Sequence, residues 1–289
     1  LYYVNPMAIL TRSVYDHSPV KVAGICHSVV GTTRQLAGYL GVPFDEITYH
    51  VAGLNHMAWF LKLERRGVDL YPELRRRLDD PAVVAKDPVR FEILRQFGAF
   101  VTESSYHFSE YVPYFRKDPQ VIEQIKAPTK LGAQWVRNGW ANQKRYVADL
   151  LAGKVSVTER HSGEYAADII HSLETNTPRR ANLNVRNDAL ITNLPPGACV
   201  EVPCLLDGAG VHPTVVGELP AHLAALDRMV VGTQELAAEA AVRCDREMVF
   251  RAIALDPLTA AVLTLPRIRE MVDALFEAER QYLPAAYYA

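Results

Sequence analysis

The sequence lacks the hallmarks of several protein classes. Basic and acidic residues nearly balance, at 31 Lys and Arg against 33 Asp and Glu in 289 residues, so we expect neither nucleic acid nor a membrane surface as a partner. No apolar run approaches the length of a membrane-spanning helix. Four cysteines, at positions 26, 199, 204 and 244, are too few for a disulfide scaffold, which predicts reduced thiols in a cytoplasmic protein.

A sizeable hydrophobic core is present instead. Hydrophobic residues make up 49% of the chain and charged residues 22%, which is typical of a folded globular protein. The chain opens with an apolar, strand-like segment at residues 1–4, which the Asn5-Pro6 pair terminates. Because a domain rarely opens inside a core strand, we expect part of the fold to precede Leu1.

The first 65 residues predict an α/β arrangement in which strands and helices alternate. Ser28 is the expected cap of the second helix, and Gly41 is expected to end it. Each strand is followed by polar residues at its carboxyl end, as at the active sites of α/β proteins. The expected strands are residues 1–4, 21–26, 46–52 and 57–63, and the expected helices are residues 7–15 and 28–40.

The remainder of the chain predicts a mixed, helix-rich α+β domain. The Ala-rich helix at residues 221–241 could be a subunit contact or part of the core, and the helices after residue 220 are expected to break at Pro257 and Pro266. The fold class is therefore α/β plus α+β. The other expected helices are residues 88–100, 127–151 and 162–173, and the expected strands are residues 179–185, 199–206 and 213–219, with a turn at residues 207–210.

Two separate segments carry residues that could bind a metal. Cys26 lies at a strand end directly before a helix, where free amides and the helix dipole are expected to lower the pKa of a thiol. His56 lies at a junction between two strands, thirty residues later. A thiolate and an imidazole on adjacent strand ends can share one metal ion. On the residues alone, a core cysteine and a histidine with ordinary polar partners remain the alternative.

Two further polar clusters stand out. Residues 102–113 carry two glutamates, His107 and several aromatic residues, which indicates either the lining of a pocket or a solvated loop. Residues 184–188 are followed by the turn-forming residues 194–197, and this cluster could be no more than a polar turn.

Seven short motifs are distributed in order over essentially all of the chain: YVNPMA at 3–8, GICHSV at 24–29, VAGLNHMA at 51–58, TESS at 102–105, SEY at 109–111, NVRND at 184–188 and VEVP at 200–203. With these motifs the sequence resembles the family 4 glycoside hydrolases, in particular their bacterial α-galactosidase branch.

The resemblance implies a lactate/malate dehydrogenase-like fold, NAD and a divalent metal, usually manganese, as cofactors, and a homodimer or homotetramer. Family members are exceptions to the two-carboxylate mechanism of glycosidases. Residues 1–55 would be the carboxyl-terminal remnant of a Rossmann-like NAD-binding domain, and residues 56–289 the substrate and metal domain. The glycine-rich dinucleotide motif is expected upstream of Leu1, since Gly208-Ala209-Gly210 lacks the third glycine and opens no helix.

Carried over by position, the resemblance assigns roles to particular residues. Cys26 and His56 match the metal ligands, and Tyr111 best matches the catalytic base. His27 stands where phospho-α-glucosidases of the family carry an Asp that acts as the general acid. Because this Asp is absent here, His27 and His107 are both eligible as the acid. The Cys-His-Ser sequence points to unphosphorylated α-glycosides. The proposed substrate-binding residues are Asn5, Asn55, His107 and Arg186, with Asn5 also contacting the cofactor.

In the implied mechanism, oxidation of the sugar C3 hydroxyl by NAD makes the C2 proton removable. The metal would polarise the C3 oxygen and the C2 hydroxyl, and Tyr111 would take the C2 proton if a cation lowers its pKa from about 10. Loss of the C1 substituent, addition of water and return of the hydride complete the hydrolysis. Two alternatives are an NAD-dependent hydroxyacid dehydrogenase of the same fold and an inactive fragment that acts only in oligomerisation.

Overall fold

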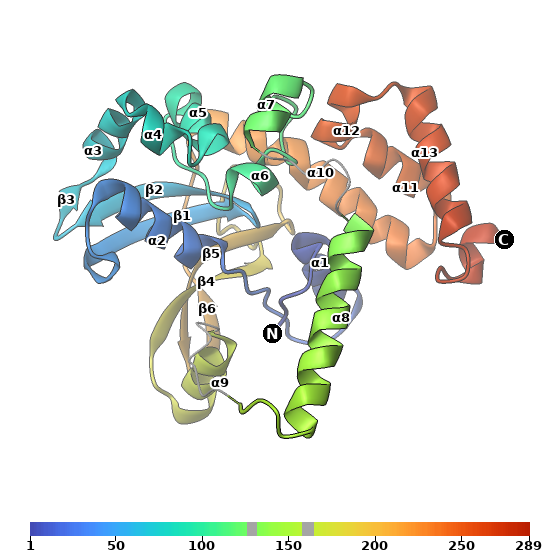
Figure 1. Ribbon diagram of the computed structural model, residues 1–289, viewed down its shortest axis with the longest axis horizontal. Coiled ribbons are helices and arrows are strands. Elements are labelled where there is room, and N and C mark those ends of the chain that lie inside the picture. Colours follow the sequence, from blue (N-terminus) through green and yellow to red (C-terminus); the bar gives the residue numbers. More distant parts are fainter. Residues whose placement is uncertain (126–131, 158–164) are drawn as a thin grey trace.

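The computed structural model describes residues 1–125, 132–157 and 165–289. Its strands form one sheet with helices around it (Figure 1). Within these residues the sheet has the order β3-β2-β1-β5-β4, and β6 pairs with β5. The strand pairs are antiparallel, and β1 meets β5 through Gly53 opposite Glu201. The strands are β1 (Ile47–Leu54), β2 (Met57–Arg65), β3 (Val68–Asp69), β4 (Arg179–Arg186), β5 (Cys199–Asp207) and β6 (Gly210–Pro213).

The amino-terminal segment joins this sheet through single bridges. Tyr2 pairs in parallel with Gly24, and Gly24 pairs with Asn184 of β4, on either side of α1 (Met7–His17). This strand–helix–strand connection is the expected α/β feature. The predicted strands at residues 1–4 and 21–26 are wrong in length, because the pairing is confined to one residue on each side.

Helix α2 (Ser28–Leu40) has the predicted bounds, and Gly41 ends it with a φ of 68°. Its start differs from the prediction. Ser28 is the first helical residue, and His27 occupies the capping position without a side-chain capping bond. The predicted capping role of Ser28 is therefore wrong.

The β1–β2 hairpin is buried on both faces. Phe60 packs into a cluster with α2, α3 (Tyr71–Arg76) and α5 (Pro88–Phe97). The neighbouring Trp59 points into the larger cluster, which includes apolar residues of β4, β5 and α10. Because successive strand residues face opposite ways, this alternation fixes the register and hence the position of the hairpin turn, residues 55 and 56. Three shorter helices lie nearby: α4 (Pro81–Val84), α6 (Ser105–Phe108) and α7 (Pro119–Gln124).

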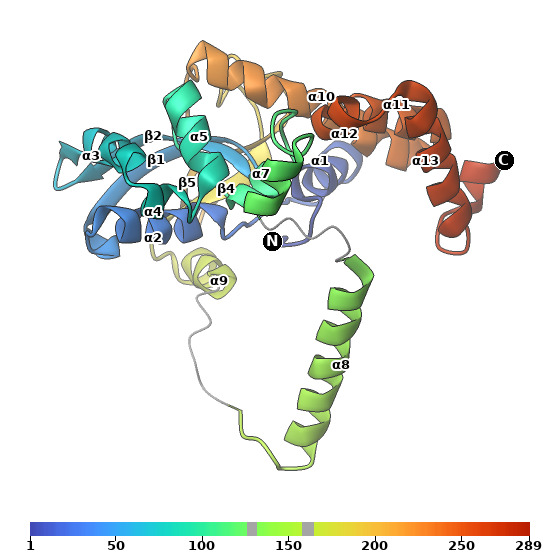
Figure 2. The ribbon, with the colours of Figure 1, turned by 45° about the horizontal axis from the view of Figure 1, so that its top comes forward.

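In the chain, helices α8 (Gly132–Leu151) and α9 (Ala166–Thr175) come after strands β1–β3 and before strands β4–β6. Figure 2 shows α8 standing clear of the rest of the molecule. The expected helices over residues 127–151 and 162–173 match these elements in part, since residues 126–131 and 158–164 lie outside the described residues. The helix expected at residues 88–100 ends early, at Phe97, because Gly98 adopts a positive φ of 74°.

The carboxyl-terminal helices follow α10 (Ala221–Arg243) in the chain and lie beyond its end, on the side away from the sheet (Figure 1). The breaks expected at the two prolines are confirmed, whereas a further break at Cys244, in a left-handed conformation, was not expected. Leu223, Leu226 and Val230 of α10 are buried in the large cluster, so this helix contributes to the core. The remaining helices are α11 (Arg246–Ala254), α12 (Pro257–Val262) and α13 (Leu265–Ala278).

The predicted strand at residues 213–219 is wrong in position. Asp207 pairs with Gly210 across a two-residue turn, so β6 begins at once and has ended by residue 214. The fold class, α/β plus α+β, is confirmed. Among the described helices, none is long and apolar enough to cross a membrane.

Candidate active site

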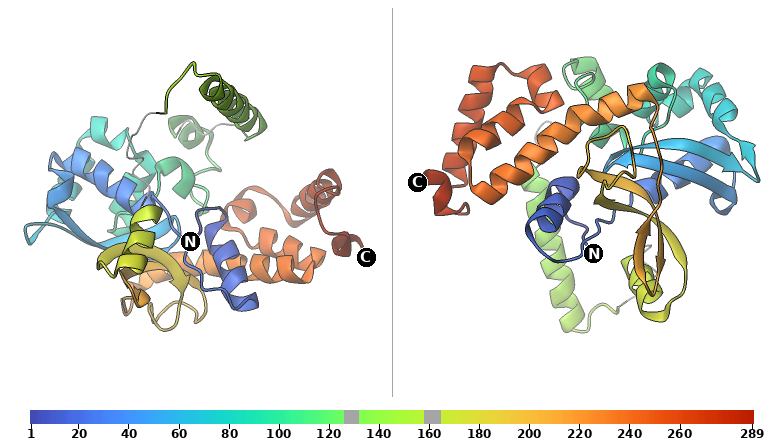
Figure 3. Two further views of the ribbon diagram at one scale, coloured as in Figure 1. Left: turned by 90° about the horizontal axis from the view of Figure 1, so that it is seen from below. Right: turned by 180° about the vertical axis from the view of Figure 1, so that it is seen from behind.

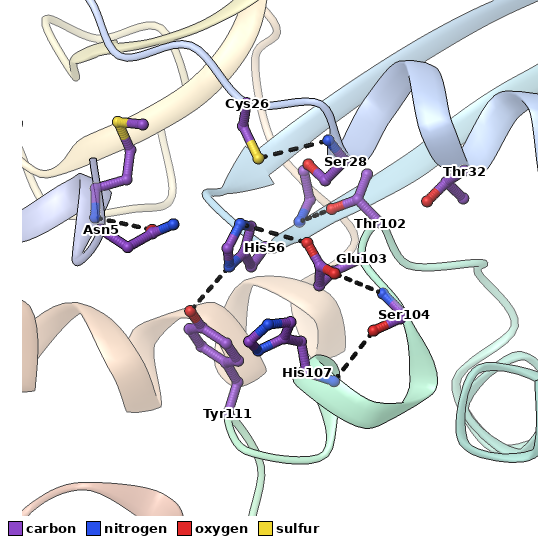
Figure 4. A network of polar contacts seen from close by, with 12 residues as sticks. Asn5, Cys26, Ser28, Thr32, His56, Thr102, Glu103, Ser104, His107 and Tyr111 are labelled. Carbon is purple, nitrogen blue, oxygen red and sulfur yellow. Dashed lines mark hydrogen bonds and ion pairs between the residues drawn. The ribbon is translucent and has the colours of Figure 1, made fainter. Parts of the chain in front are cut away.

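Cys26 lies in the loop between the Gly24 bridge and α2 (Figure 4). Tyr165 fixes its backbone, because the phenol donates to the Cys26 carbonyl at 2.6 Å and accepts from the Cys26 amide at 3.2 Å. The Ser28 amide donates to Sγ at 3.4 Å. This contact holds the sulfur at the start of α2, toward the β1–β2 turn.

His56 occupies that turn in a left-handed conformation, with a φ of 63°. Its side chain is buried, and both ring nitrogens have neighbours. Nδ1 lies 3.1 Å from the Tyr111 hydroxyl, and Nε2 lies 3.3 Å from Oε2 of Glu103. A proton on Nδ1 directs a hydrogen bond to Tyr111 and leaves the Nε2 lone pair facing Glu103 and Cys26.

Glu103 is the third member of this cluster. Its backbone has a φ of 73°, which is rare for a residue with a side chain. Thr102 ties the segment to β2 through two hydrogen bonds with Ala58, at 2.8 and 3.1 Å. The Ser104 amide binds Oε1 at 3.0 Å, so Oε2 is the oxygen that points at His56. Strained backbone held by such ties is typical of functional sites.

Cys26, His56 and Glu103 fit a divalent metal ion. One ligand atom from each lies within 4.8 Å of the others, close enough for a single ion. A thiolate and an imidazole favour zinc or iron, and the carboxylate adds the harder donor that manganese prefers. Three protein ligands would leave coordination positions open, as at catalytic metal sites. The sequence analysis proposed Cys26 and His56 as ligands and did not single out Glu103, although residues 102–113 stood out as a polar cluster.

The pKa of the Cys26 thiol differs from the prediction. Burial raises this pKa above its usual range, and hydrogen bonds from Ser28 and Asn55 oppose the shift only in part. The expected lowering by the helix dipole is therefore wrong for the thiol without a cation. Desolvation is the largest contribution to the shift.

Tyr111 follows α6 and is largely buried beside His56. Burial raises the pKa of its phenol, and the negative charges of Glu103, Glu110 and Cys26 raise it further. A divalent cation held by Cys26 and Glu103 would cancel two of these charges and so favour the phenolate.

His107 lies in α6 next to both residues. Its ring centre is 5.8 Å from that of His56, and its Nδ1 donates to Glu110 at 2.9 Å. This hydrogen bond raises the pKa of His107, which extends its acidic form to higher pH. The structure therefore brings together four of the predicted site residues: Cys26, His56, His107 and Tyr111.

His27 and Asn5 lie at the edge of this cluster. The His27 ring is exposed and stacks on Tyr3, with ring centres 4.9 Å apart and planes inclined by 8°. It also meets Tyr165 edge-on at 6.2 Å. Asn5 is exposed, and its Oδ1 accepts a hydrogen bond from the Met7 amide at the start of α1.

Arg186 contacts residues of α1 and of its own turn rather than the metal cluster, that is, the side chains of Cys26, His56 and Glu103. It pairs with Asp16 and, at 3.2 Å, with Asp188, and its guanidinium lies 5.3 Å from the Tyr15 ring centre. Its substrate-binding role stays a prediction. The neighbouring Asn187 has a structural role, since its buried amide bonds the backbone of Ile191 and of residues 194 and 195.

Glu201 lies behind the cluster and was not singled out from the sequence. Its side chain is fully buried, and neither carboxyl oxygen has a hydrogen-bond partner in the described part of the chain. Desolvation raises its pKa well above the usual range, and the nearby Cys26 charge adds to the shift. Burial therefore favours the neutral form of the Glu201 carboxyl beneath the site.

Comparison with known proteins decides the family. Residues 51–259 match the model of the family 4 glycosyl hydrolase C-terminal domain, and residues 1–42 match the model of family 4 glycosyl hydrolases. The chain belongs to the family 4 glycosyl hydrolases. The two models divide this family 4 chain between residues 42 and 51, whereas the expected domain boundary at residue 55 falls in the turn of the β1–β2 hairpin and stays a prediction.

Two relatives of this family 4 chain are α-galactosidases. That of Bacillus subtilis (strain 168) is 42% identical over 98% of this chain and 66% of the relative. That of Rhizobium meliloti (strain 1021) is 31% identical over 100% of this chain and 61% of the relative. The chain thus spans less than two thirds of the length of these relatives.

A solved structure shares the fold. The 6-phospho-β-glucosidase of Thermotoga maritima, determined with manganese, NAD⁺ and glucose-6-phosphate, has a TM-score of 0.75 and 20% identity. The match covers 97% of this chain and 65% of that one. At this identity the likeness concerns the fold alone.

Proposed function

We propose that this family 4 chain carries the metal and substrate residues of an enzyme that hydrolyses α-galactosides. The observation that carries the proposal is the convergence of Cys26, His56 and Glu103 beside the Tyr111 hydroxyl. The α-galactosidase relatives, at 42% and 31% identity, support galactose as the sugar.

A divalent metal, manganese by analogy with the Thermotoga maritima structure, would be held by Cys26, His56 and Glu103. When bound, such an ion acts as a Lewis acid toward sugar oxygens. NAD is the second proposed cofactor, and when bound it supplies a hydride acceptor. Gly208 and Gly210 lie at the β5–β6 turn rather than at a helix start, so in the described part of the chain they form no dinucleotide site. Asn5 remains the residue proposed to contact NAD.

Tyr111 is the proposed base for the sugar C2 proton. His56 orients the phenol through Nδ1 at 3.1 Å, and the same hydrogen bond favours the phenolate when Nδ1 carries the proton. His56 would thus act twice, as a metal ligand through Nε2 and as the orienting group of Tyr111.

His27 is the proposed acid for the leaving group, with His107 as the alternative. His27 presents an exposed imidazole next to Cys26, held between Tyr3 and Tyr165. His107 has a raised pKa and so keeps its proton to higher pH, which suits a donor. Separate His27→Ala and His107→Ala variants, assayed with galactosides of good and poor leaving groups, distinguish them. Only loss of the acid should spare the good leaving group.

A hydroxyacid dehydrogenase fits the site less well. Such an enzyme needs an arginine to bind the substrate carboxylate, and the cavity beside Tyr111 is lined by no Arg among the described residues. It would also have no use for a cysteine ligand.

We further propose a homodimer or homotetramer in the cytoplasm. Helix α8 supports assembly, because it stands clear of the body while Trp140 and Leu151 are 64% and 83% exposed. The four cysteines are free, which supports a reducing compartment for the proposed thiolate ligand. Size-exclusion chromatography with light scattering measures the assembly.

Removal of the metal tests the proposed function. The full-length gene product, supplied with NAD and Mn²⁺, should cleave p-nitrophenyl α-galactoside, lose this activity in EDTA and regain it with Mn²⁺. Cleavage that persists in EDTA after complete metal removal would refute the proposal.

A further inference from the structure

A cavity of about 260 Å³ lies beside the metal cluster, between the start of α1 and helix α10. Figure 3 shows these helices side by side in the view from behind. We propose that this cavity receives the C5–C6 end of the sugar and admits only an uncharged group at C6. The inference rests on the proposed function and deepens it, because it assigns sugar specificity to α10 and to the residue preceding α12.

The cavity and the metal cluster share residues. Tyr111 is one of the residues that line the cavity. Its hydroxyl points at His56 (Figure 4). Asn55, also in the lining, directly precedes the ligand His56. In a pyranose the C2–C3 edge lies across the ring from C5. A sugar whose C2 proton faces Tyr111 and whose C2–C3 edge faces the metal ligands therefore directs C6 away from them, toward the cavity.

One uncharged polar group at the cavity awaits a partner. The hydroxyl of Thr233, on α10, is buried and has no hydrogen-bond partner in the described part of the chain. Buried polar groups in folded proteins are nearly always paired, so a ligand hydroxyl is its natural partner. Asn55 and Gln234 add two further uncharged polar side chains to the lining.

The charges in the lining are acidic. Glu110 and Asp256 line the cavity, and none of the described lining residues is Lys or Arg. Arg116 and His107 both bind the Glu110 carboxylate at 2.9 Å, so its charge is compensated. Asp256 instead caps α12 by accepting from the Thr259 amide and hydroxyl, both at 2.8 Å. A carboxylate or phosphate at C6 would meet this acid and find no cation, whereas a hydroxymethyl group would not be repelled.

Adding one cation to the lining tests this assignment. The probes are galactose, galacturonate and galactose 6-phosphate, with binding to the Mn²⁺-loaded chain measured by calorimetry or saturation-transfer NMR. The unmodified chain should bind galactose at least about tenfold more tightly than either anion. Gln234→Arg should narrow that ratio by about tenfold, the scale of one charge-assisted hydrogen bond. Met229→Arg places the same charge on α10 at a 39% exposed position outside the lining and should leave the ratio unchanged.

A second variant tests the hydroxyl partner. Thr233→Val keeps the volume and should weaken galactose binding about fivefold or more. Equal binding of galactose and galacturonate, failure of all three sugars to bind, or unchanged binding in both cavity variants would overturn the inference. If the variants shift sugar binding as expected and the full-length protein hydrolyses no α-galactoside, the cavity assignment stands and the proposed function fails.

Discussion

Replacing Glu103 by Gln should weaken Mn²⁺ binding by about 100-fold, or ~2.7 kcal/mol. Loss of a partner outside the ligand shell typically costs 10–100-fold in metal affinity, and loss of a charged ligand should reach at least the upper end of that range. The geometry supports Glu103 as such a ligand, because Ser104 binds Oε1 and leaves Oε2 at 3.3 Å from His56 Nε2.

Glu110→Gln is the matched control, since it removes a carboxylate seven residues along the same segment. The Glu110 charge is already compensated by Arg116 and His107, each at 2.9 Å. Its loss should therefore change Mn²⁺ affinity by less than about fivefold, the equivalent of the ~1 kcal/mol that exposed ion pairs reach.

The assay is a titration of the metal-free chain with Mn²⁺. Binding is measured by calorimetry and by the electron paramagnetic resonance signal of the free ion. Circular dichroism checks that each variant is folded. Cys26→Ser and His56→Ala serve as positive controls that should also lose the ion. If these two weaken binding and Glu103→Gln matches the unmodified chain within threefold, Glu103 is not a ligand. If none of the three weakens binding, the metal site lies elsewhere.

Three further outcomes follow from the surroundings of Tyr111, Glu201 and Asp87. Tyr111→Phe should keep Mn²⁺ and lower kcat by roughly two to four orders of magnitude, the scale of a lost general base; unimpaired turnover would move that role to another residue. Glu201→Gln should stabilise the metal-free protein at pH 8. The pKa of Glu201 is raised in the folded state, so its ionisation lowers folding stability as pH rises above the unfolded pKa of about 4.3. In thermal melts from pH 5 to 8 the difference in Tm between the variant and the unmodified protein should widen with pH, and a constant difference would contradict this. Asp87→Asn should cost about 3–5 kcal/mol in urea unfolding, since it leaves the buried Arg90 guanidinium without its carboxylate, and a loss below 1 kcal/mol would show the pair to be dispensable.

Local signals in the sequence were enough for several elements. The bounds of α2 follow from apolar spacing and from Gly41, which ends the helix with a positive φ. The breaks before α12 and α13 follow from prolines that cannot continue a helix. The meeting of Cys26 and His56 follows from placing each at the end of a strand-like segment.

Features that depend on long-range packing could not be predicted from the sequence. The side chain of Glu103 faces His56 only because Thr102 is tied to β2 and the backbone at position 103 takes a positive φ. The raised pKa of Cys26 depends on its burial in the folded chain, which outweighs the local hydrogen bonds that lower it. The cavity walls in α10 come from residues more than a hundred positions after Tyr111, a neighbourhood that no local pattern encodes.

The most direct test of the proposed chemistry is hydrolysis of an α-galactoside in D₂O by the full-length protein with NAD and Mn²⁺. If the C2 proton leaves to a base such as Tyr111 and a solvent deuteron replaces it, NMR of the released galactose should show deuterium at C2. An ordinary glycosidase never breaks that C–H bond. Galactose released with its C2 hydrogen fully retained would contradict the account.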